Sequence, residues 1–240
     1  MNKMYRIGEA AKVLGVSIQT LRRWAKEGSL VPDFISPGGH RFYSATALER
    51  FSESLVHAAR MWVTGAVTPP LTKDLYCETS ATFLVRLNRF SQELQQSKEF
   101  TESSSLVVAI AGEIGNNSFD HNLGNWPDVP GIFFGFDLKR RHVVLADRGQ
   151  GVLKTLKRVR ATLTTELQAV RVAFTERISG RAPEKRGNGL KFVRDNVMAQ
   201  SLDLLFQSGD AILMIGSGHK KIELQTTDET IRGTLAVLHF

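Results

Sequence analysis

The stretch that decides the fold of most of this chain is residues 104–122, which read SSLVVAIAGEIGNNSFDHN. Its first half repeats apolar residues at helical spacing. Four polar residues then continue the same stripe of the helix: Glu113, Asn117, Asp120 and His121. A polar cluster that extends an apolar stripe is costly to bury unless it faces a ligand, a metal ion or water. The stretch therefore predicts a helix with a polar site, although surface helices also carry such residues.

Glu113 and Asn117 stand one helical turn apart and suit a magnesium–phosphate complex. An amide oxygen can ligate Mg²⁺, and a carboxylate can orient an attacking water molecule. We therefore take Asn117 as the candidate metal ligand and Glu113 as the candidate general base.

Two glycine-containing patches lie further along the chain. Asp147-Arg148-Gly149-Gln150-Gly151 follows an apolar run and places a carboxylate at a strand end, where it can accept a hydrogen bond from an exocyclic amine. A plain strand followed by a turn would look the same. Gly187-Asn188-Gly189-Leu190 opens a helix, and the free N–H groups of a helix N-terminus bind anions.

The remaining periodicity predicts an α+β arrangement with helices on one face of a sheet. We expect a second long helix over residues 74–99, and a weak helical pattern over 165–178. Apolar runs predict strands over residues 131–138, 142–146, 202–207, 211–215, 222–225 and 233–240. Residues 64–70 break the periodicity and are expected to link two domains, 1–66 and 67–240.

In this order the patches resemble the GHKL (Bergerat-fold) ATPases over residues 75–240. Residues 113–121 match the N box of that family, residues 147–151 its first glycine box and residues 187–190 its second. Gly233-Thr234 looks like the start of its closing strand. The resemblance implies a two-layer α/β sandwich that binds ATP and Mg²⁺.

The resemblance also implies residue roles. Asp147 would bind the adenine amine, Asn117 would ligate Mg²⁺, and residues 150–186 would form the lid over ATP. The nucleotide-binding residues carried over are Asn117, Asp120, His121, Asp147, Gly149, Gly151, Gly187, Asn188, Gly189, Leu190 and Thr234.

Two details sort among the branches of that family. Lys185 stands where sensor kinases have a leading glycine, which makes the second box more similar to the anti-sigma-factor kinases. His57 is followed by Ala58-Ala59-Arg60 rather than by an acidic residue, so we exclude an autophosphorylating histidine kinase. The chain contains no G-x-x-x-x-G-K-[ST] P-loop.

The first third of the chain has a different pattern. Two short helical stretches meet at Gly15-Val16, and Ser17 is placed to cap the second of them. Pro37-Gly38-Gly39 then separates two short strand-like runs, which predicts a hairpin. Helix, turn, helix and hairpin together predict a winged helix-turn-helix, whose second helix can enter the major groove of DNA. A helix-turn-helix that contacts protein remains the alternative.

Residues 4–55 resemble the MerR-type winged helix in three ordered pieces, Tyr5 to Ala11, Leu21 to Trp24 and Gly38 to Tyr43. The resemblance implies double-stranded DNA as a partner, with contacts from Gln19, Arg22, Arg23, His40, Arg41 and Tyr43. Trp24 and Phe42 are expected in the core. Such regulators dimerise through a long helix after the wing, whereas only residues 51–62 precede the linker here, so a homodimer would need another contact surface.

Composition agrees with a DNA-binding first domain. Residues 1–70 hold nine Lys or Arg and five Asp or Glu, a net charge of +4 out of +7 for the chain. Basic surface of this kind attracts nucleic acid. Cys77 is the lone cysteine, and no apolar run is long enough for a signal peptide or a membrane span, so we expect a cytoplasmic protein without membrane contact.

These observations leave three functions open. The first is a transcription regulator whose DNA or partner binding depends on ATP. The second is a serine/threonine kinase of a partner protein, with Glu113 activating the hydroxyl. The third is an ATP-gated DNA clamp, which is disfavoured because the chain shows no transducer domain after the second glycine box.

Overall fold

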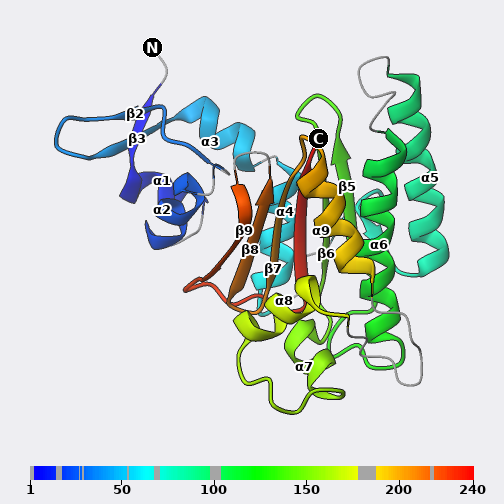
Figure 1. Ribbon diagram of the computed structural model, residues 1–240. Coiled ribbons are helices and arrows are strands. Elements are labelled where there is room, and N and C mark those ends of the chain that lie inside the picture. The colour runs from blue at the N-terminus through cyan, green and yellow to red at the C-terminus, as the bar shows by residue number, and fades with distance from the viewer. Residues whose placement is uncertain are drawn as a thin grey trace. The chain divides into compact units, whose positions relative to one another are not determined.

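A seven-stranded antiparallel sheet and a smaller three-stranded one organise the computed structural model (Figure 1). The structure describes residues 3–14, 18–26, 28, 30–52, 54–67, 71–97, 104–177, 188–216 and 219–240. Within these ranges the chain divides into two compact units, residues 1–58 and 59–240. The sequence pattern placed the boundary between the domains after residue 66. The two compact units instead divide after Ala58, inside a helix and before the expected linker.

The first unit contains two short helices followed by a hairpin and a third helix. Its elements are β1 (Met4–Arg6), α1 (Ile7–Leu14), α2 (Ile18–Lys26), β2 (Phe34–Ile35), β3 (Arg41–Ser44) and α3 (Ala45–Ser52), and the strands are ordered β1-β3-β2. Leu14, Leu21 and Trp24 meet in one buried core with α3. The hydroxyl of Ser44 accepts a hydrogen bond from the backbone N–H of Ala47 and so caps α3.

Helix α4 (Leu55–Thr64) contains the boundary between the units, which falls after Ala58. In the first unit, the ring of His57 lies 5.5 Å from that of Phe51 and 6.2 Å from that of Trp24. In the second unit, Arg60 and Trp62 are both about 1% exposed. Each end of one continuous helix is therefore part of a different folded unit.

The second unit is built on a sheet with the order β4-β5-β6-β10-β7-β8-β9. Its strands are β4 (Tyr76–Cys77), β5 (Ile132–Asp137), β6 (His142–Asp147), β7 (Asp203–Ser208), β8 (Ala211–Gly216), β9 (His219–Thr226) and β10 (Thr234–His239). Its helices are α5 (Ser80–Gln96), α6 (Ser104–Asn122), α7 (Gly151–Lys157), α8 (Glu166–Thr175) and α9 (Gly189–Ala199). The mixed helix and sheet architecture agrees with the expected α+β class.

Helices α5, α6, α8 and α9 bury their apolar sides against one face of this sheet, in a core that includes Phe90, Ile110, Phe174, Val193 and Phe206 (Figure 1). The opposite face is covered too. The guanidinium of Arg60 donates to the side chain of Gln207, and the carbonyl of Val63 accepts from the N–H of Arg232. The expected two-layer arrangement is therefore incomplete, because the second half of α4 adds a further layer over part of the sheet.

Two histidines face each other across neighbouring strands of the sheet. His142 on β6 and His239 on β10 are paired in register, with ring centroids 5.5 Å apart. Burial lowers the pKa of His142, and the nearby His239 lowers it further. Burial also lowers the pKa of His239. Both rings are therefore neutral in the folded unit at neutral pH.

This pair predicts a pH-dependent stability. Because the folded pKa values lie below the ordinary value of 6.5, the unfolded chain takes up protons first as the pH falls. Stability is thus fully present above about pH 6.5 and is lost as the pH falls toward the folded pKa values. We expect the melting temperature of the His142→Val variant to fall less between pH 7 and pH 5 than that of the wild type. An equal fall, or a similar effect from His40→Val, would contradict this assignment.

Candidate functional site

Asp147 is the buried centre of the candidate site. It ends β6, is 1% exposed, and receives three hydrogen bonds. The hydroxyls of Ser118 and Thr234 donate to Oδ2 at 2.8 and 2.5 Å, and the N–H of Gly149 donates to Oδ1 at 2.8 Å. Burial raises the pKa of this carboxyl, while these donors oppose the rise.

The sequence pattern did not identify two residues that hold this centre. Ser118 directly follows Asn117 on α6 and donates to Asp147 from the sheet-facing side of that helix. Asn122, at the end of α6, accepts from the N–H of Gln150 and donates to the carbonyl of Ser118, both at 2.8 Å. Both are buried polar residues on a stripe of α6 that is otherwise occupied by apolar side chains. Their position on that stripe is the feature of the sequence that could have identified them.

Gly149 is required by the close approach of Asn122. A Cβ atom added at Gly149 would overlap the side-chain amide of Asn122, well inside van der Waals contact. The backbone of the loop after β6 therefore packs directly against the side chain of Asn122 at the end of α6.

A Gly149→Ala variant tests this packing. We expect it to destabilise the second unit by roughly 1–3 kcal/mol, because either Asn122 or the loop must move. Gly112→Ala in α6 is the matched control, since its Cβ would meet only a terminal methyl group of Leu87 at 3.2 Å. Chemical denaturation of both variants measures the difference, and equal stabilities would argue against the packing described.

The second glycine patch approaches the polar residues of α6. A Cβ at Gly189, the first residue of α9, would overlap the Glu113 carboxylate and lie 3.4 Å from the Asn117 amide. Asn188 precedes the helix, is exposed and makes no side-chain capping bond, whereas Leu190 packs against the core. Glu113, Asn117 and Gly189 are thus neighbours, although they are distant in sequence. Gly187 lies outside the described residues.

The other predicted residues lie around this centre. Gly151 begins α7 with a φ of 73°, a conformation that glycine adopts without strain. Asp120 is exposed on α6, and His121 accepts a hydrogen bond from the Gln150 amide through its carbonyl. Neither is among the donors to Asp147. The expected lid over residues 150–186 contains α7 and α8, and its residues 178–186 lie outside the described part.

A cavity of about 490 Å³ lies beside the first glycine patch. Its lining includes residues 149–151 and 230–233 together with Glu166 and Asp210, but not Asp147 or Asn117. Glu166 accepts from the Ser208 hydroxyl at 3.1 Å, and burial raises its pKa. Within the described residues, no three His, Cys, Asp or Glu side chains cluster in a way that would hold a metal ion.

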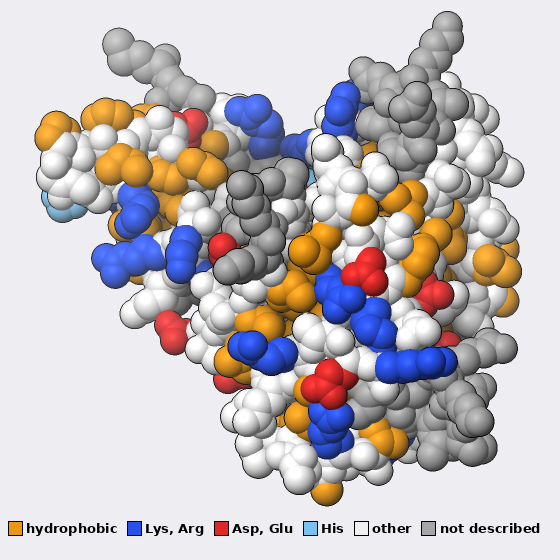
Figure 2. Space-filling view, in the orientation of Figure 1, with side chains coloured by type: hydrophobic (Ala, Val, Ile, Leu, Met, Phe, Trp, Pro, Cys, Tyr) orange, Lys and Arg blue, Asp and Glu red, His pale blue; other side chains and the backbone are white. Residues whose placement is uncertain are grey.

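The first unit exposes only part of its predicted contact set. Gln19, Arg22 and His40 are exposed, and Arg23 and Arg41 are partly so. Figure 2 shows basic side chains interspersed with apolar ones on this unit. Helix α2 and the hairpin therefore offer donors to phosphate oxygens.

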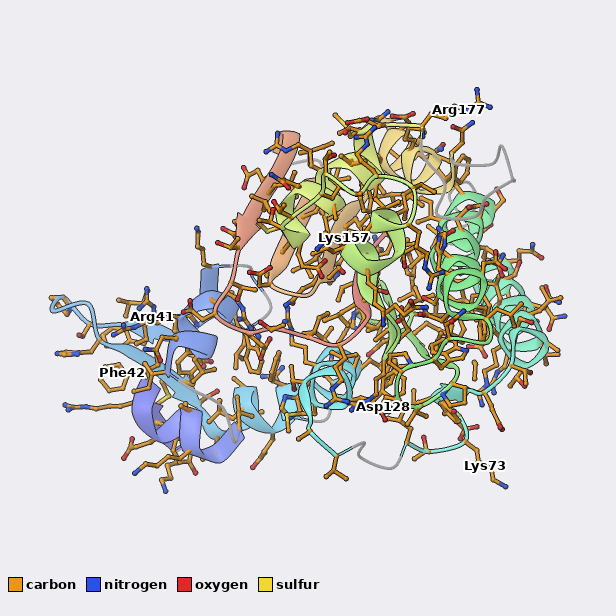
Figure 3. All side chains as sticks on the ribbon, turned by 90° about the horizontal axis from the view of Figure 1, so that it is seen from below. Arg41, Phe42, Lys73, Asp128, Lys157 and Arg177 are labelled. Carbon is orange, nitrogen blue, oxygen red and sulfur yellow. The ribbon has the colours of Figure 1, made fainter. Side chains whose placement is uncertain are left out.

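The structure reverses the predictions for two neighbouring residues of β3. Tyr43 is fully buried, and burial raises the pKa of its hydroxyl, so Tyr43 is a core residue rather than a DNA contact. Phe42, expected in the core, is half-buried and packs beside Phe34 and Arg6. Figure 3 shows Arg41 and Phe42 together on this hairpin. The alternation along a strand fixes one face against the core, and the sequence pattern assigned the wrong face.

Two short helices with a hairpin after them are among the described elements of the first unit. Residues 6–43 match the model of the MerR family regulatory protein. The chain therefore carries a helix-turn-helix of the MerR type, as found in DNA-binding transcriptional regulators. No curated protein matches the sequence.

One similar solved structure is described as a transcriptional regulator of the MerR family from Bacillus cereus. It is 19% identical, covers 49% of this chain and 84% of its own, and has a TM-score of 0.24. So low a TM-score does not establish a shared fold over that length. Among the described residues, no helix has the length and apolarity needed to span a membrane.

Proposed function

We propose that this protein is a DNA-binding regulator whose second unit binds Mg-ATP in the manner of the GHKL ATPases. One observation carries the proposal: the three separated sequence patches lie close together. Ser118 of α6, Gly149 and Thr234 all donate to Asp147, and Gly189 lies against Glu113.

The chemistry of Asp147 supports an adenine ligand. The carboxyl oxygens of Asp147 accept three hydrogen bonds, and such an oxygen can also take a hydrogen bond from an exocyclic amine. Guanine would present a carbonyl oxygen at the equivalent position and would be rejected.

The neighbourhood of α9 supports a phosphate chain with its metal. The N-terminus of an eleven-residue helix carries partial positive charge and free N–H groups. Asn117 would supply an oxygen to Mg²⁺, and Glu113 stands beside it to orient water.

The first unit would bind double-stranded DNA with α2 in the major groove and the hairpin against the backbone. Gel retardation of DNA with no nucleotide, with ADP and with ATP, each with magnesium, tests the link between the two units. We expect the retarded fraction to differ between nucleotide states in the wild type and to become equal in Asp147→Asn. Identical retardation of the wild type in every state would refute nucleotide-dependent binding.

A second candidate function is phosphoryl transfer to a partner protein, and the placement of Glu113 beside Asn117 and Gly189 favours it. A Glu113→Ala variant separates the two functions. If DNA binding still responds to ATP, turnover is dispensable for regulation. If phosphorylation of a partner disappears, the kinase function is supported.

A further inference from the structure

Arg148 stands between the two residues that define the proposed adenine site, yet its side chain points elsewhere. The side chain is fully buried. Its Nε and Nη2 donate to Oδ2 of Asp128 at 2.8 and 2.5 Å. Its Nη1 donates to the carbonyl of Gly65 at 3.0 Å and to that of Trp62. All three nitrogens of the guanidinium are therefore used.

The two carbonyls belong to the C-terminal end of α4, where backbone acceptors lack partners within the helix. Helices are commonly stabilised there by a cation, but the last turn of α4 contains no basic residue. Arg148 supplies that cation from the loop after β6. This half of α4 is held a second time by Arg60, which is paired with Glu229 at 3.2 Å.

The backbone of Arg148 is fixed by the carboxylate of Asp147. Oδ1 of Asp147 accepts from the N–H of Gly149, and this bond closes a turn with Arg148 at its centre. A ligand that engages Asp147 changes the hydrogen bonding of the same carboxylate. The position of the Arg148 backbone, and with it the reach of its guanidinium, depends on that bond.

A second route leads from Asp147 to the same guanidinium. Thr234 donates to Asp147, and Arg232, two residues earlier, donates to Asp128 at 2.8 Å. Asp128 in turn holds Arg148. The pKa of Asp128 is lowered, most strongly by its hydrogen bond from Arg148, so the carboxylate is charged throughout the physiological range.

We propose that Arg148 transmits the occupancy of the Asp147 site to the C-terminal half of α4, residues 60–65. Nucleotide at Asp147 strengthens the docking of residues 60–65, and docking of α4 strengthens nucleotide binding by the same factor, because such coupling is reciprocal. This inference rests on the proposed nucleotide function.

Hydrogen exchange of the full-length chain, with and without Mg-ATP, tests the proposal. In the wild type we expect the amides of residues 60–65 to exchange about tenfold more slowly with Mg-ATP, equivalent to ~1.4 kcal/mol. In Arg148→Met, Mg-ATP should bind about tenfold more weakly and, at saturation, should leave their exchange unchanged. Arg140→Met is the matched control, because it removes an arginine paired with an aspartate at the turn that leads into the other end of β6.

If Arg148→Met does not fold, Asp128→Asn weakens the same anchor without deleting the buried cation. Slowing of residues 60–65 by Mg-ATP in these variants as in the wild type would overturn the proposal. The proposal would also be overturned if the wild type binds Mg-ATP by calorimetry but the exchange of residues 60–65 does not change. In that case the proposed nucleotide function would stand. Absence of any calorimetric heat in the wild type would remove both.

Discussion

Replacing Asp147 by Asn is expected to lower the affinity of the second unit for Mg-ATP by about a hundredfold, or ~2–3 kcal/mol. The variant loses one of the two carboxyl oxygens that can accept from the adenine amine. An amide at this position presents a donor where the ligand also presents one, and two opposed donors cannot both be satisfied.

The fold should survive this substitution. Two of the three donors to Asp147 are the hydroxyls of Ser118 and Thr234, which can rotate to accept from an amide N–H. Calorimetry with Mg-ATP measures the affinity, and circular dichroism verifies folding. A folded Asp147→Asn variant with wild-type affinity would show that Asp147 does not recognise the base.

The second large effect is expected on DNA binding. Arg22 is exposed on α2, and Arg41 stands on the hairpin (Figure 3). An arginine that contacts a base edge contributes about 1–3 kcal/mol and a phosphate contact adds to that, so the Arg22→Ala/Arg41→Ala double variant should bind about a hundredfold more weakly. The dependence of log affinity on log salt concentration should become shallower by about one unit for each arginine.

Arg89→Ala is the control for that loss of charge. Arg89 lies on α5 of the second unit with its side chain 71% exposed, and it is paired with Glu93. Fluorescence anisotropy at several salt concentrations compares the variants. If Arg89→Ala weakens binding as much per charge as the double variant does, the effect is general electrostatic attraction rather than contact by α2 and the hairpin.

Long periodic elements were predictable from the sequence because burial of one face imposes the period. Helix α6 spans Ser104–Asn122, the residues that the stripe indicates, and the apolar runs gave β5, β6, β7, β8 and β10 within one or two residues. Two short elements of the second unit were missed. Strand β4 has two residues and α7 has seven, too few for a period to emerge. The sequence pattern placed the residues of β4 in the helix expected over 74–99, and those of α7 in the lid expected over 150–186.

Some polar residues of the candidate site could likewise be predicted from the sequence, and others could not. Glu113, Asn117 and Asp147 stand out because charged or amide side chains interrupt apolar runs. Ser118 and Arg148 do not, since their roles depend on partners 29 and 86 residues away in sequence. Tyr43 was misassigned because hairpin residues next to a turn can face either side, and only packing against Leu48 and its neighbours decides between them.

The claim on which most else depends is that patches from α6, the end of β6 and the start of α9 form one nucleotide site. Isothermal titration of the wild-type chain with ATP in magnesium buffer, beside GTP under the same conditions, tests it most directly. The account predicts saturable binding of ATP at one site per chain and at least about a hundredfold weaker binding of GTP. An absence of saturable heat with ATP, or equal affinity for both nucleotides, would contradict it.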